Sequence, residues 1–325
     1  MRSFAHVNAT SLEEAITVLR RYGKRAAVIA GGTDLLGKMK DEILPTYPEA
    51  LVNLKTIPGL DFIDSRKDMI VIGALTRLED IATSEAVTER CPALAQAARA
   101  TASPHLREMG TLAGNICQDI RCWYYRNGGN RFPCLRKGGG KCYAIDGDNR
   151  YHSIFGGTVE EGCYAVHPSD TAPALVALNA IVATSRREIG IDDFFRVGES
   201  STTVLDPDEI VTEIRIPAPS GRSAFVKFAL RKSIDFPIVN CAAMVAFSRK
   251  KVAAARVCLN AVYVNPYRAR KAEEALLGKP LDAAAAQAAA EAVAADARPL
   301  PYNAYMVPVA KAMVKRALLG CAGPA

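Results

Sequence analysis

Residues 118–168 constrain the fold of this chain more than any other feature, because they interrupt an otherwise regular alternation of strand and helix patterns. The part from Arg121 to Cys142 holds three cysteines, five glycines and six basic residues, with no acidic residue among them. A loop of about 50 residues rarely keeps one structure inside a compact domain unless something else organises it. We therefore expect an insertion, at about residues 117–168, that depends on an additional stabilising interaction.

Regular patterns surround the insertion. Ser11 and Glu14 are the ends of a capping box, which predicts a helix through Arg21. The strands expected before the insertion are residues 26–30, 51–54 and 69–75, and the helices expected there are one from residue 35 and a region at 78–102 that breaks at Pro92. After the insertion, residues 170–178 read as a helix and residues 180–184 as a strand. This order predicts that the fold closes again behind the insertion.

The pattern changes after residue 209. Mostly β-branched, alternating runs predict strands at 209–217, 224–231, 239–247 and 252–264. Helical patterns follow at 271–277, 283–295 and 307–319. Strands followed by helices indicate a separate α+β domain at residues 218–325, with the boundary near Pro217–Arg222 and a first domain at residues 1–217.

Composition limits the class of protein. The formal net charge of +7 is spread along the chain, and no arginine-rich arm or nucleic-acid-binding motif is present, so we expect no nucleic-acid partner. The longest apolar runs fall well short of the ~20 residues that span a bilayer, and the first residues lack a signal-peptide pattern. Nine cysteines, an odd number, indicate reduced thiols and argue against a secreted disulfide scaffold. We expect a cytoplasmic protein.

Two glycine-rich turns follow strand patterns and lead into helical patterns. They are AGGTDLL at residues 30–36 and GTLAGN at residues 110–115. Glycines at such positions let backbone amides approach a ligand, and amides at a helix start favour a phosphate. Neither turn is the GxGxxG fingerprint of dinucleotide-binding domains, so no NAD motif is visible. Each turn alone is more often structural than functional, but two of them favour a phosphate-bearing ligand.

The cysteines fall into two groups. Four sit among apolar neighbours and are expected to be small buried side chains: Cys91, Cys241, Cys258 and Cys321. The other five lie in or at the edge of the insertion: Cys117, Cys122, Cys134, Cys142 and Cys163. Four thiolates around one metal centre would organise the loop, and the neighbouring cations would offset their charge. The wide spacings leave zinc and an iron–sulfur cluster both open.

Several motifs together resemble one family. AGGTDLL, IGALT at residues 72–76, GTLAGN and HPSDTAPALVALNA at residues 167–180 are similar to the flavin-binding medium subunit of molybdenum hydroxylases, the xanthine dehydrogenase family. The resemblance covers essentially the whole chain. It implies an α+β fold with a two-part FAD-binding domain of the vanillyl-alcohol-oxidase and molybdopterin dehydrogenase type, with subdomains at about residues 1–56 and 57–217. It also implies a C-terminal domain of the CO dehydrogenase flavoprotein type.

The insertion narrows the resemblance. Most members run from the GTLAGN turn almost directly into the SDTAP motif, whereas this chain places about fifty residues between them. The order of cysteines in the insertion looks like that of the 4-hydroxybenzoyl-CoA reductase flavin subunit, and some bacterial aldehyde oxidoreductases have a similar insertion. In both groups it binds a [4Fe–4S] cluster. The ligands implied by this resemblance are Cys122, Cys134, Cys142 and Cys163, with Cys117 as the spare thiol.

The resemblance also implies FAD contacts. The residues carried over are Ile29, Ala30, Gly31, Gly32, Thr33, Asp34, Leu35, Gly73, Gly110, Thr111, Ala113, Gly114, Asn115, Asp170, Ile210, Val211 and Lys227. Without the resemblance, Asp170 would be read as a helix N-cap, Ile210 and Val211 as core, and Lys227 as a solvated side chain.

The implied function is electron transfer. An oxidoreductase subunit of this kind would pass electrons between an external carrier such as ferredoxin, the [4Fe–4S] cluster, FAD, and the [2Fe–2S] and molybdenum centres of partners. The partners would be a molybdopterin-binding large subunit and a small [2Fe–2S] subunit, assembled as a dimer of heterotrimers. We expect a 4-hydroxybenzoyl-CoA reductase-like complex, with aldehyde or purine and N-heterocycle oxidation as the alternative. The insertion predicts poor reactivity with NADH.

Two other classes of function stay open from the residues alone. The chain could be a zinc-stapled assembly module without redox activity. It could also be a stand-alone flavin oxidase, but that requires a substrate pocket with a catalytic base, and the four scattered histidines form no convincing set.

Overall fold

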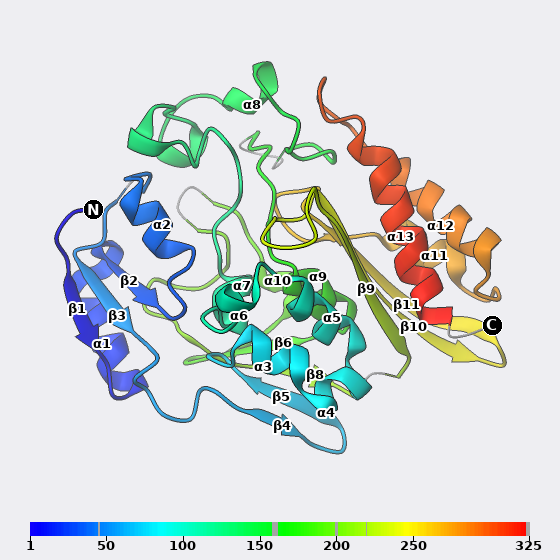
Figure 1. Ribbon diagram of the computed structural model, residues 1–325, viewed down its shortest axis with the longest axis horizontal. Helices are drawn as coiled ribbons and strands as arrows, with labels where there is room; N and C mark the ends of the chain where they lie inside the picture. Colours follow the sequence, from blue (N-terminus) through cyan, green and yellow to red (C-terminus); the bar gives the residue numbers. More distant parts are fainter. Residues whose placement is uncertain (45, 158–161, 199–200, 219, 323–325) are drawn as a thin grey trace.

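The computed structural model describes residues 1–44, 46–157, 162–198, 201–218 and 220–322. Figure 1 shows three regions side by side, with the insertion across the top of the molecule. No helix in the described part of the chain is long and apolar enough to cross a membrane. Residues 158–161 of the predicted insertion and Pro219 at the predicted domain junction lie outside the described residues.

The first region is a small parallel sheet with order β1-β3-β2 and two helices beside it. Its elements are β1 (Ala5–Asn8), α1 (Leu12–Tyr22), β2 (Ala26–Ile29), α2 (Leu35–Lys40) and β3 (Ala50–Asn53). The predicted capping box is confirmed, because Ser11 Oγ accepts a hydrogen bond from Glu14 N at 3.1 Å and Glu14 Oε2 accepts one from Thr10 N at 2.7 Å. The parallel register leaves the loop between β2 and α2 at the carboxyl edge of the sheet.

The second region is a five-stranded sheet with order β4-β5-β8-β6-β7, in which neighbouring strands run antiparallel. Its strands are β4 (Ile63–Ser65), β5 (Met69–Gly73), β6 (Ile181–Thr184), β7 (Glu188–Gly190) and β8 (Val211–Pro217). Its helices are α3 (Leu78–Thr83), α4 (Glu85–Arg90), α5 (Pro92–Ala100), α6 (Pro104–Arg107), α7 (Leu112–Ile116), α9 (Thr171–Ala177) and α10 (Ile191–Phe194). The largest apolar core lies between these strands and these helices and contains residues of both.

The third region is an antiparallel sheet with order β12-β11-β10-β9, covered by three helices. Its elements are β9 (Arg222–Phe228), β10 (Val239–Ser248), β11 (Lys251–Asn260), β12 (Tyr267–Arg268), α11 (Arg270–Leu276), α12 (Ala283–Ala294) and α13 (Met306–Ala322). The strand expected at 252–264 ends early, because the backbone at Ala261 turns through a φ of 61°. Val262 then accepts a hydrogen bond from Ile154 N at 3.0 Å, so this apolar run packs against the insertion.

The helical region predicted at 78–102 forms three helices. Its break at Pro92 is confirmed, since Pro92 begins α5. A second break occurs at Ser84, whose side chain accepts a hydrogen bond from Val87 N at 3.4 Å and so caps α4. The three helices pack on one another and α5 also contacts β9, which ties the second region to the third.

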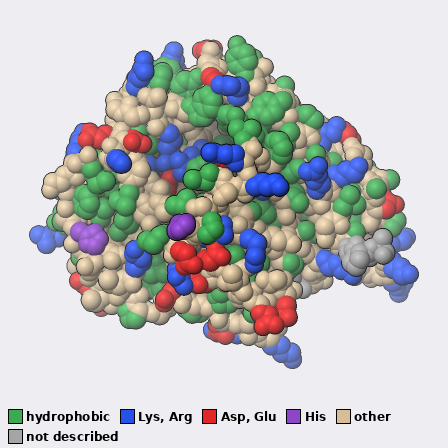
Figure 2. Space-filling view, viewed as in Figure 1, with side chains coloured by type: hydrophobic (Ala, Val, Ile, Leu, Met, Phe, Trp, Pro, Cys, Tyr) green, Lys and Arg blue, Asp and Glu red, His purple; other side chains and the backbone are tan. Residues whose placement is uncertain are grey.

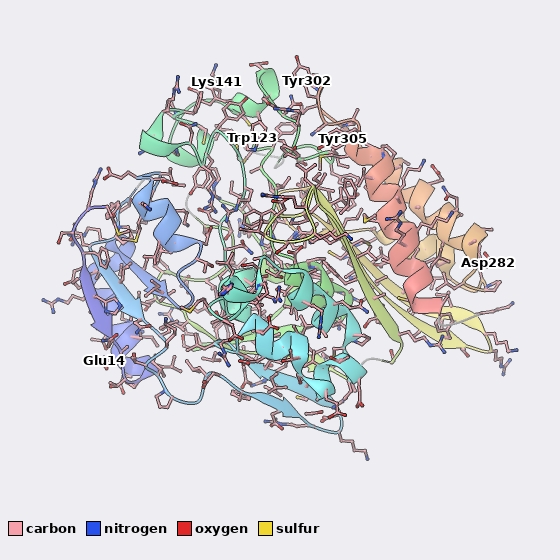
Figure 3. All side chains as sticks on the ribbon, in the orientation of Figure 1. Glu14, Trp123, Lys141, Asp282, Tyr302 and Tyr305 are labelled. Atoms are coloured by element: carbon pink, nitrogen blue, oxygen red, sulfur yellow. The ribbon has the colours of Figure 1, made fainter. Side chains whose placement is uncertain are left out.

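The insertion contains little regular structure. Its elements are the 3-10 turns η2 (Gly128–Asn130) and η3 (Leu135–Lys137) and the short helix α8 (Tyr143–Asp146). It has an apolar cluster of its own, built around Ile120, Tyr125 and Ala165 together with Cys134 and Cys163. At its outer end, Tyr305 Oη donates a hydrogen bond to Arg150 O at 2.9 Å (Figure 3). The expectation that a metal centre replaces a missing core is therefore too strong, because packing organises part of this segment.

Candidate functional site

The two glycine-rich turns lie against each other. A methyl group added at Gly31 would overlap the carbonyl oxygen of Met109 and touch Gly110, so only glycine allows this approach. Gly32 adopts a φ of 73°, in the left-handed region that favours glycine. Residues far apart in the sequence thus present their backbones to one space, as two turns on a common ligand require.

That space is a cavity of about 540 Å³, within the usual range for small-molecule and cofactor sites. It lies between the first two regions and extends to the loop between β9 and β10. All the predicted FAD contacts line it except Gly73 and Lys227: Ile29, Ala30, Gly31, Gly32, Thr33, Asp34, Leu35, Gly110, Thr111, Ala113, Gly114, Asn115, Asp170, Ile210 and Val211. The side chains of Ile210 and Val211 are buried at its apolar side.

Gly73 and Lys227 lie next to lining residues, Gly73 beside Ala74 in the sequence and Lys227 against Asp170. A methyl group at Gly73 would overlap the carbonyl oxygen of Leu60, so this glycine permits close strand packing. Lys227 on β9 extends towards Asp170, and its Nζ lies 2.7 Å from Asp170 Oδ2. The structure therefore places Lys227 behind a cavity residue, as a buried partner of Asp170 and neither as a solvated side chain nor as part of the lining.

Asp170 is a buried carboxylate with two partners, Lys227 and Asn240. Besides Lys227, Asn240 Nδ2 donates a hydrogen bond to its Oδ1 at 2.7 Å, and Lys227 Nζ also donates to Ala100 O at 2.9 Å. Burial raises the pKa of Asp170, and the Lys227 ammonium opposes that rise. Asp170 occupies the N-cap position of α9, as the sequence alone suggested, but its side chain makes no capping hydrogen bond and pairs with Lys227 and Asn240 instead.

Asn115 joins the second glycine turn to the start of α9. Its Oδ1 accepts hydrogen bonds from Ser169 Oγ at 2.5 Å and from Thr171 Oγ1 at 2.7 Å. Ser169 and Thr171 flank Asp170 in the sequence, so the turn and the carboxylate are positioned together. The insertion lies between these two motifs in the sequence. Its first and last residues must therefore be close together in the fold.

The four predicted cluster cysteines converge. Cys122, Cys134, Cys142 and Cys163 line one small cavity, together with Tyr124 and other insertion residues. Its volume is about 10 Å³, close to what a single water needs. Cys117 lies elsewhere, in the lining of the larger cavity. The remaining cysteines, Cys91, Cys241, Cys258 and Cys321, are buried in the cores as predicted.

Hydrogen-bond donors point at three of these sulfurs. Backbone amides of Tyr124 and Tyr125 bond to Cys122, those of Arg136 and Lys137 to Cys134, and that of Ala165 to Cys163. The Nε2 atom of His152 lies 3.2 Å from Cys122 Sγ. Amide bonds to sulfur are a feature of iron–sulfur sites, where they set the reduction potential.

Burial favours the protonated form of three of the thiols, those of Cys122, Cys134 and Cys163, in the metal-free chain. Burial raises the pKa of Cys122 to about 12 and that of Cys163 to about 11, and it also raises the pKa of Cys134. Binding a metal centre here would release protons, because only thiolates act as ligands. Among the residues described, no group of three or more His, Cys, Asp or Glu side chains is arranged to hold a single metal ion.

Comparison with known proteins identifies the architecture. Residues 2–219 match the family model of the FAD binding domain in molybdopterin dehydrogenase, and residues 224–320 match the CO dehydrogenase flavoprotein C-terminal domain. The chain belongs to the FAD-binding medium subunits of the molybdenum hydroxylases. The α+β fold with these two domain types is thereby confirmed, and the chain is an oxidoreductase subunit.

Individual relatives match this flavin subunit along nearly its full length. The aldehyde oxidoreductase FAD-binding subunit PaoB of Escherichia coli (strain K12) is 33% identical over 323 residues, 96% of each chain. The carbon monoxide dehydrogenase medium chain of Hydrogenophaga pseudoflava is 30% identical over 313 residues, 95% of this chain and 93% of the relative. A solved structure of that organism's carbon monoxide dehydrogenase, lacking the Mo-pyranopterin moiety, superposes with a TM-score of 0.77 at 28% identity and covers 98% of this chain and 97% of its own.

A buried ion network links the flavin subunit's glycine turn to its insertion. Asp34 in the turn accepts hydrogen bonds from Asp119 N and Arg121 Nη2, each at 3.0 Å, and pairs with Arg126 Nη1 at 2.8 Å. Burial would raise the pKa of Asp34, but Arg126, Lys38 and Arg121 outweigh it and lower the pKa. Two cations of the insertion, Arg121 and Arg126, therefore pair with a carboxylate of the same chain.

Asp119 is the second centre of this network. It pairs with Lys38 Nζ at 3.0 Å and with Arg136 Nη2 at 2.9 Å, and it accepts a hydrogen bond from Tyr125 Oη at 2.6 Å. These cations lower its pKa despite complete burial. Sequence analysis did not identify Asp119, Arg121 or Arg126 as site residues. The available signal was the basic run itself, whose charges needed carboxylate partners elsewhere in the chain.

Proposed function

We propose that this flavin subunit transfers electrons in a heteromeric molybdenum enzyme, with FAD in the large cavity and a [4Fe–4S] cluster held by Cys122, Cys134, Cys142 and Cys163. The convergence of these four thiols on one cavity is the observation that carries the cluster. When bound, FAD exchanges one or two electrons and the cluster exchanges one. The chain supplies the thiolate ligands, the amides that face them and the dipoles around the flavin.

The donor set fits an iron–sulfur cluster better than zinc. Four cysteines, three of them with backbone amides near their sulfurs, resemble the ligand sets of [4Fe–4S] sites. A zinc ion draws its ligands to about 2.3 Å, so a preformed zinc site brings at least three donors close together. No such group occurs in the described ranges. The 10 Å³ cavity requires the four side chains to turn outward around a cube, which a loop with little regular structure permits.

The proposed partners follow from the family. The relatives named above are a FAD-binding subunit and a medium chain, that is, parts of larger assemblies. We propose a molybdopterin-binding large subunit and a small [2Fe–2S] subunit, in a dimer of heterotrimers, with ferredoxin as the external carrier. All nine cysteines are free, which fits the reduced cytoplasm we propose for the complex.

The direction of electron flow separates two versions of this function. One relative is by name an aldehyde oxidoreductase and the other a carbon monoxide dehydrogenase, which favours oxidation of an aldehyde or similar substrate on the large subunit. The 4-hydroxybenzoyl-CoA reductase version, with electrons flowing inward, stays a prediction that rests on the cysteine order of the insertion. Reduction of the FAD by aldehyde in the whole complex, without added ferredoxin, distinguishes them.

Metal analysis tests the cluster. The complex purified without oxygen is expected to contain about four iron atoms and four acid-labile sulfides per flavin subunit beyond those of the small subunit. Cys134→Ser should lose this iron, whereas Cys117→Ser, at the thiol outside the cysteine cavity, should keep it. Stoichiometric zinc without iron would instead support the assembly-module alternative. Equal iron loss in both variants would contradict the proposed ligand set.

A further inference from the structure

The large cavity has few cations for an anionic cofactor. FAD carries a diphosphate, yet four carboxylates line the cavity, those of Asp34, Asp170, Glu209 and Asp235. In the portion of the chain that the structure describes, its only cationic lining residues are Lys38 and Arg121. An anion in a carboxylate-rich site requires compensation, because a buried unpaired charge is costly. Besides the backbone amides of the glycine turns, these two cations are the positive groups of the described lining that can approach the diphosphate.

Lys38 is already engaged. Its Nζ lies 3.0 Å from Asp119 Oδ2 and 3.9 Å from Asp34 Oδ2, and its side chain is 13% exposed. Arg121 differs. Its Nη2 donates to Asp34 Oδ1 at 3.0 Å, but its Nε is buried and has no hydrogen-bond acceptor. Because Nε has almost no accessible surface, a ligand in the cavity can reach only the exposed part of this guanidinium, and the Arg121 side chain is 30% exposed against 13% for Lys38.

Arg121 is also held in place. Its backbone exchanges hydrogen bonds with Val166 at 2.8 and 3.0 Å, and its guanidinium carbon lies 4.0 Å from the centre of the Phe236 ring. Figure 2 shows Lys and Arg side chains around the hollowed middle of this face, where a second cavity of about 620 Å³ shares Arg121 with the first.

We propose that the guanidinium of Arg121 donates a hydrogen bond to the diphosphate of FAD, so that the insertion completes the FAD site. Asp34, which Arg121 also contacts, belongs to the turn expected at the diphosphate, and this places the guanidinium beside the backbone amides that would share the anion. Arg121 directly precedes Cys122, a proposed cluster ligand. FAD affinity then depends on the folded insertion. The inference rests on FAD binding by the family fold and not on the cluster.

FAD titration of the full-length chain tests this inference. After removal of the cofactor, Arg121→Gln should bind FAD about 10- to 100-fold more weakly, as expected for one lost charge-assisted hydrogen bond. The FAD affinity of Arg121→Lys should lie between those of Arg121→Gln and the unmodified chain, because the ammonium keeps the charge but not the planar geometry of the guanidinium. The matched control is Arg150→Gln, an exposed arginine of the same insertion that pairs with Asp148. Its FAD affinity should equal that of the unmodified chain.

A second measurement separates FAD contact from folding. If Arg121 only stabilises the insertion, Arg121→Gln lowers the melting temperature of the FAD-free chain and leaves unchanged the rise that FAD produces. The proposal expects a smaller FAD-induced rise. An unchanged FAD dissociation constant overturns it, and so does a shifted flavin potential at unchanged affinity, which would place Arg121 at the isoalloxazine ring. FAD binding by an iron-free chain shows that the test is independent of the cluster.

Discussion

Lys227→Met removes the cationic partner of Asp170, a buried carboxylate that lines the large cavity. In the folded chain Asp170 is 3% exposed, and Lys227 Nζ, 2.7 Å away, is the cation that faces it. Methionine keeps the length of the side chain and removes only the charge and its hydrogen bonds. Asn240 Nδ2 remains as the donor to Asp170 Oδ1. Breaking a buried pair by removing one partner costs about 3–5 kcal/mol, so the variant should unfold much more easily.

The pH dependence of this loss identifies its cause. Burial already raises the pKa of Asp170, and without Lys227 it rises further above the value of about 3.9 in the unfolded chain. The folded state then keeps a proton that the unfolded state releases. Stability of the variant is therefore highest below about pH 4 and falls as pH rises towards the folded pKa, by at most about 1.4 kcal/mol per pH unit. The gap to the unmodified chain widens with pH.

Urea unfolding of the FAD-free chain at pH 5 and pH 8 measures this gap. Lys251→Met, at an exposed lysine of strand β11 in the same sheet, is the control and should change little. Adding Asp170→Asn to Lys227→Met should remove the pH dependence, because an amide has no charge to desolvate. A gap of equal size at both pH values refutes the reasoning and assigns the loss to packing alone.

Three other predictions use different contacts. Gly31→Ala should separate the glycine turns and abolish FAD retention in gel filtration, whereas Gly37→Ala, with open space around its Cβ, should be neutral or slightly stabilising. Asp119→Asn should destabilise the insertion by about 3–5 kcal/mol, seen as faster hydrogen exchange. Because the pKa of Asp119 is lowered in the folded chain, its contribution to the stability of the unmodified chain declines progressively as pH falls below the unfolded value of about 3.9 towards the folded pKa. His152→Phe should make the cluster potential more negative in an EPR redox titration, since it removes a hydrogen bond to a sulfur ligand; an unchanged potential contradicts this.

Local patterns predicted the parts of the fold that local chemistry determines. The capping box at Ser11, the break at Pro92 and the glycine turns each depend on residues a few places apart. The strands β1 and β7 were missed, because their largely exposed residues form no apolar run, unlike the equally short β2 and β3. The strand expected at 252–264 was extended too far, since an apolar run reads the same whether it pairs in a sheet or packs under a loop.

Some residues of the site could likewise be predicted from local sequence, and others could not. The glycines of the turns and the grouping of four cysteines were visible in the sequence, because each has a composition that ordinary core segments lack. The contacts of Asp34 with Asp119, Arg121 and Arg126 were not visible, since they join residues 85 or more positions apart. Lys227 was assigned to the flavin by resemblance, whereas the structure shows it pairing with Asp170.

Asp34 shows why the insertion and the flavin site form one unit. A carboxylate in a turn that faces a diphosphate would repel it, yet the resemblance places Asp34 among the FAD contacts. The structure resolves this conflict, because two guanidinium groups and one backbone amide of the insertion occupy both carboxylate oxygens. Arg121 shares its charge between Asp34 and the cavity, so the cation needed by the cofactor is held by the same acid that would otherwise oppose it. Removing the insertion would take both guanidinium groups and the amide away from Asp34 and leave it the more distant Lys38 ammonium, at 3.9 Å.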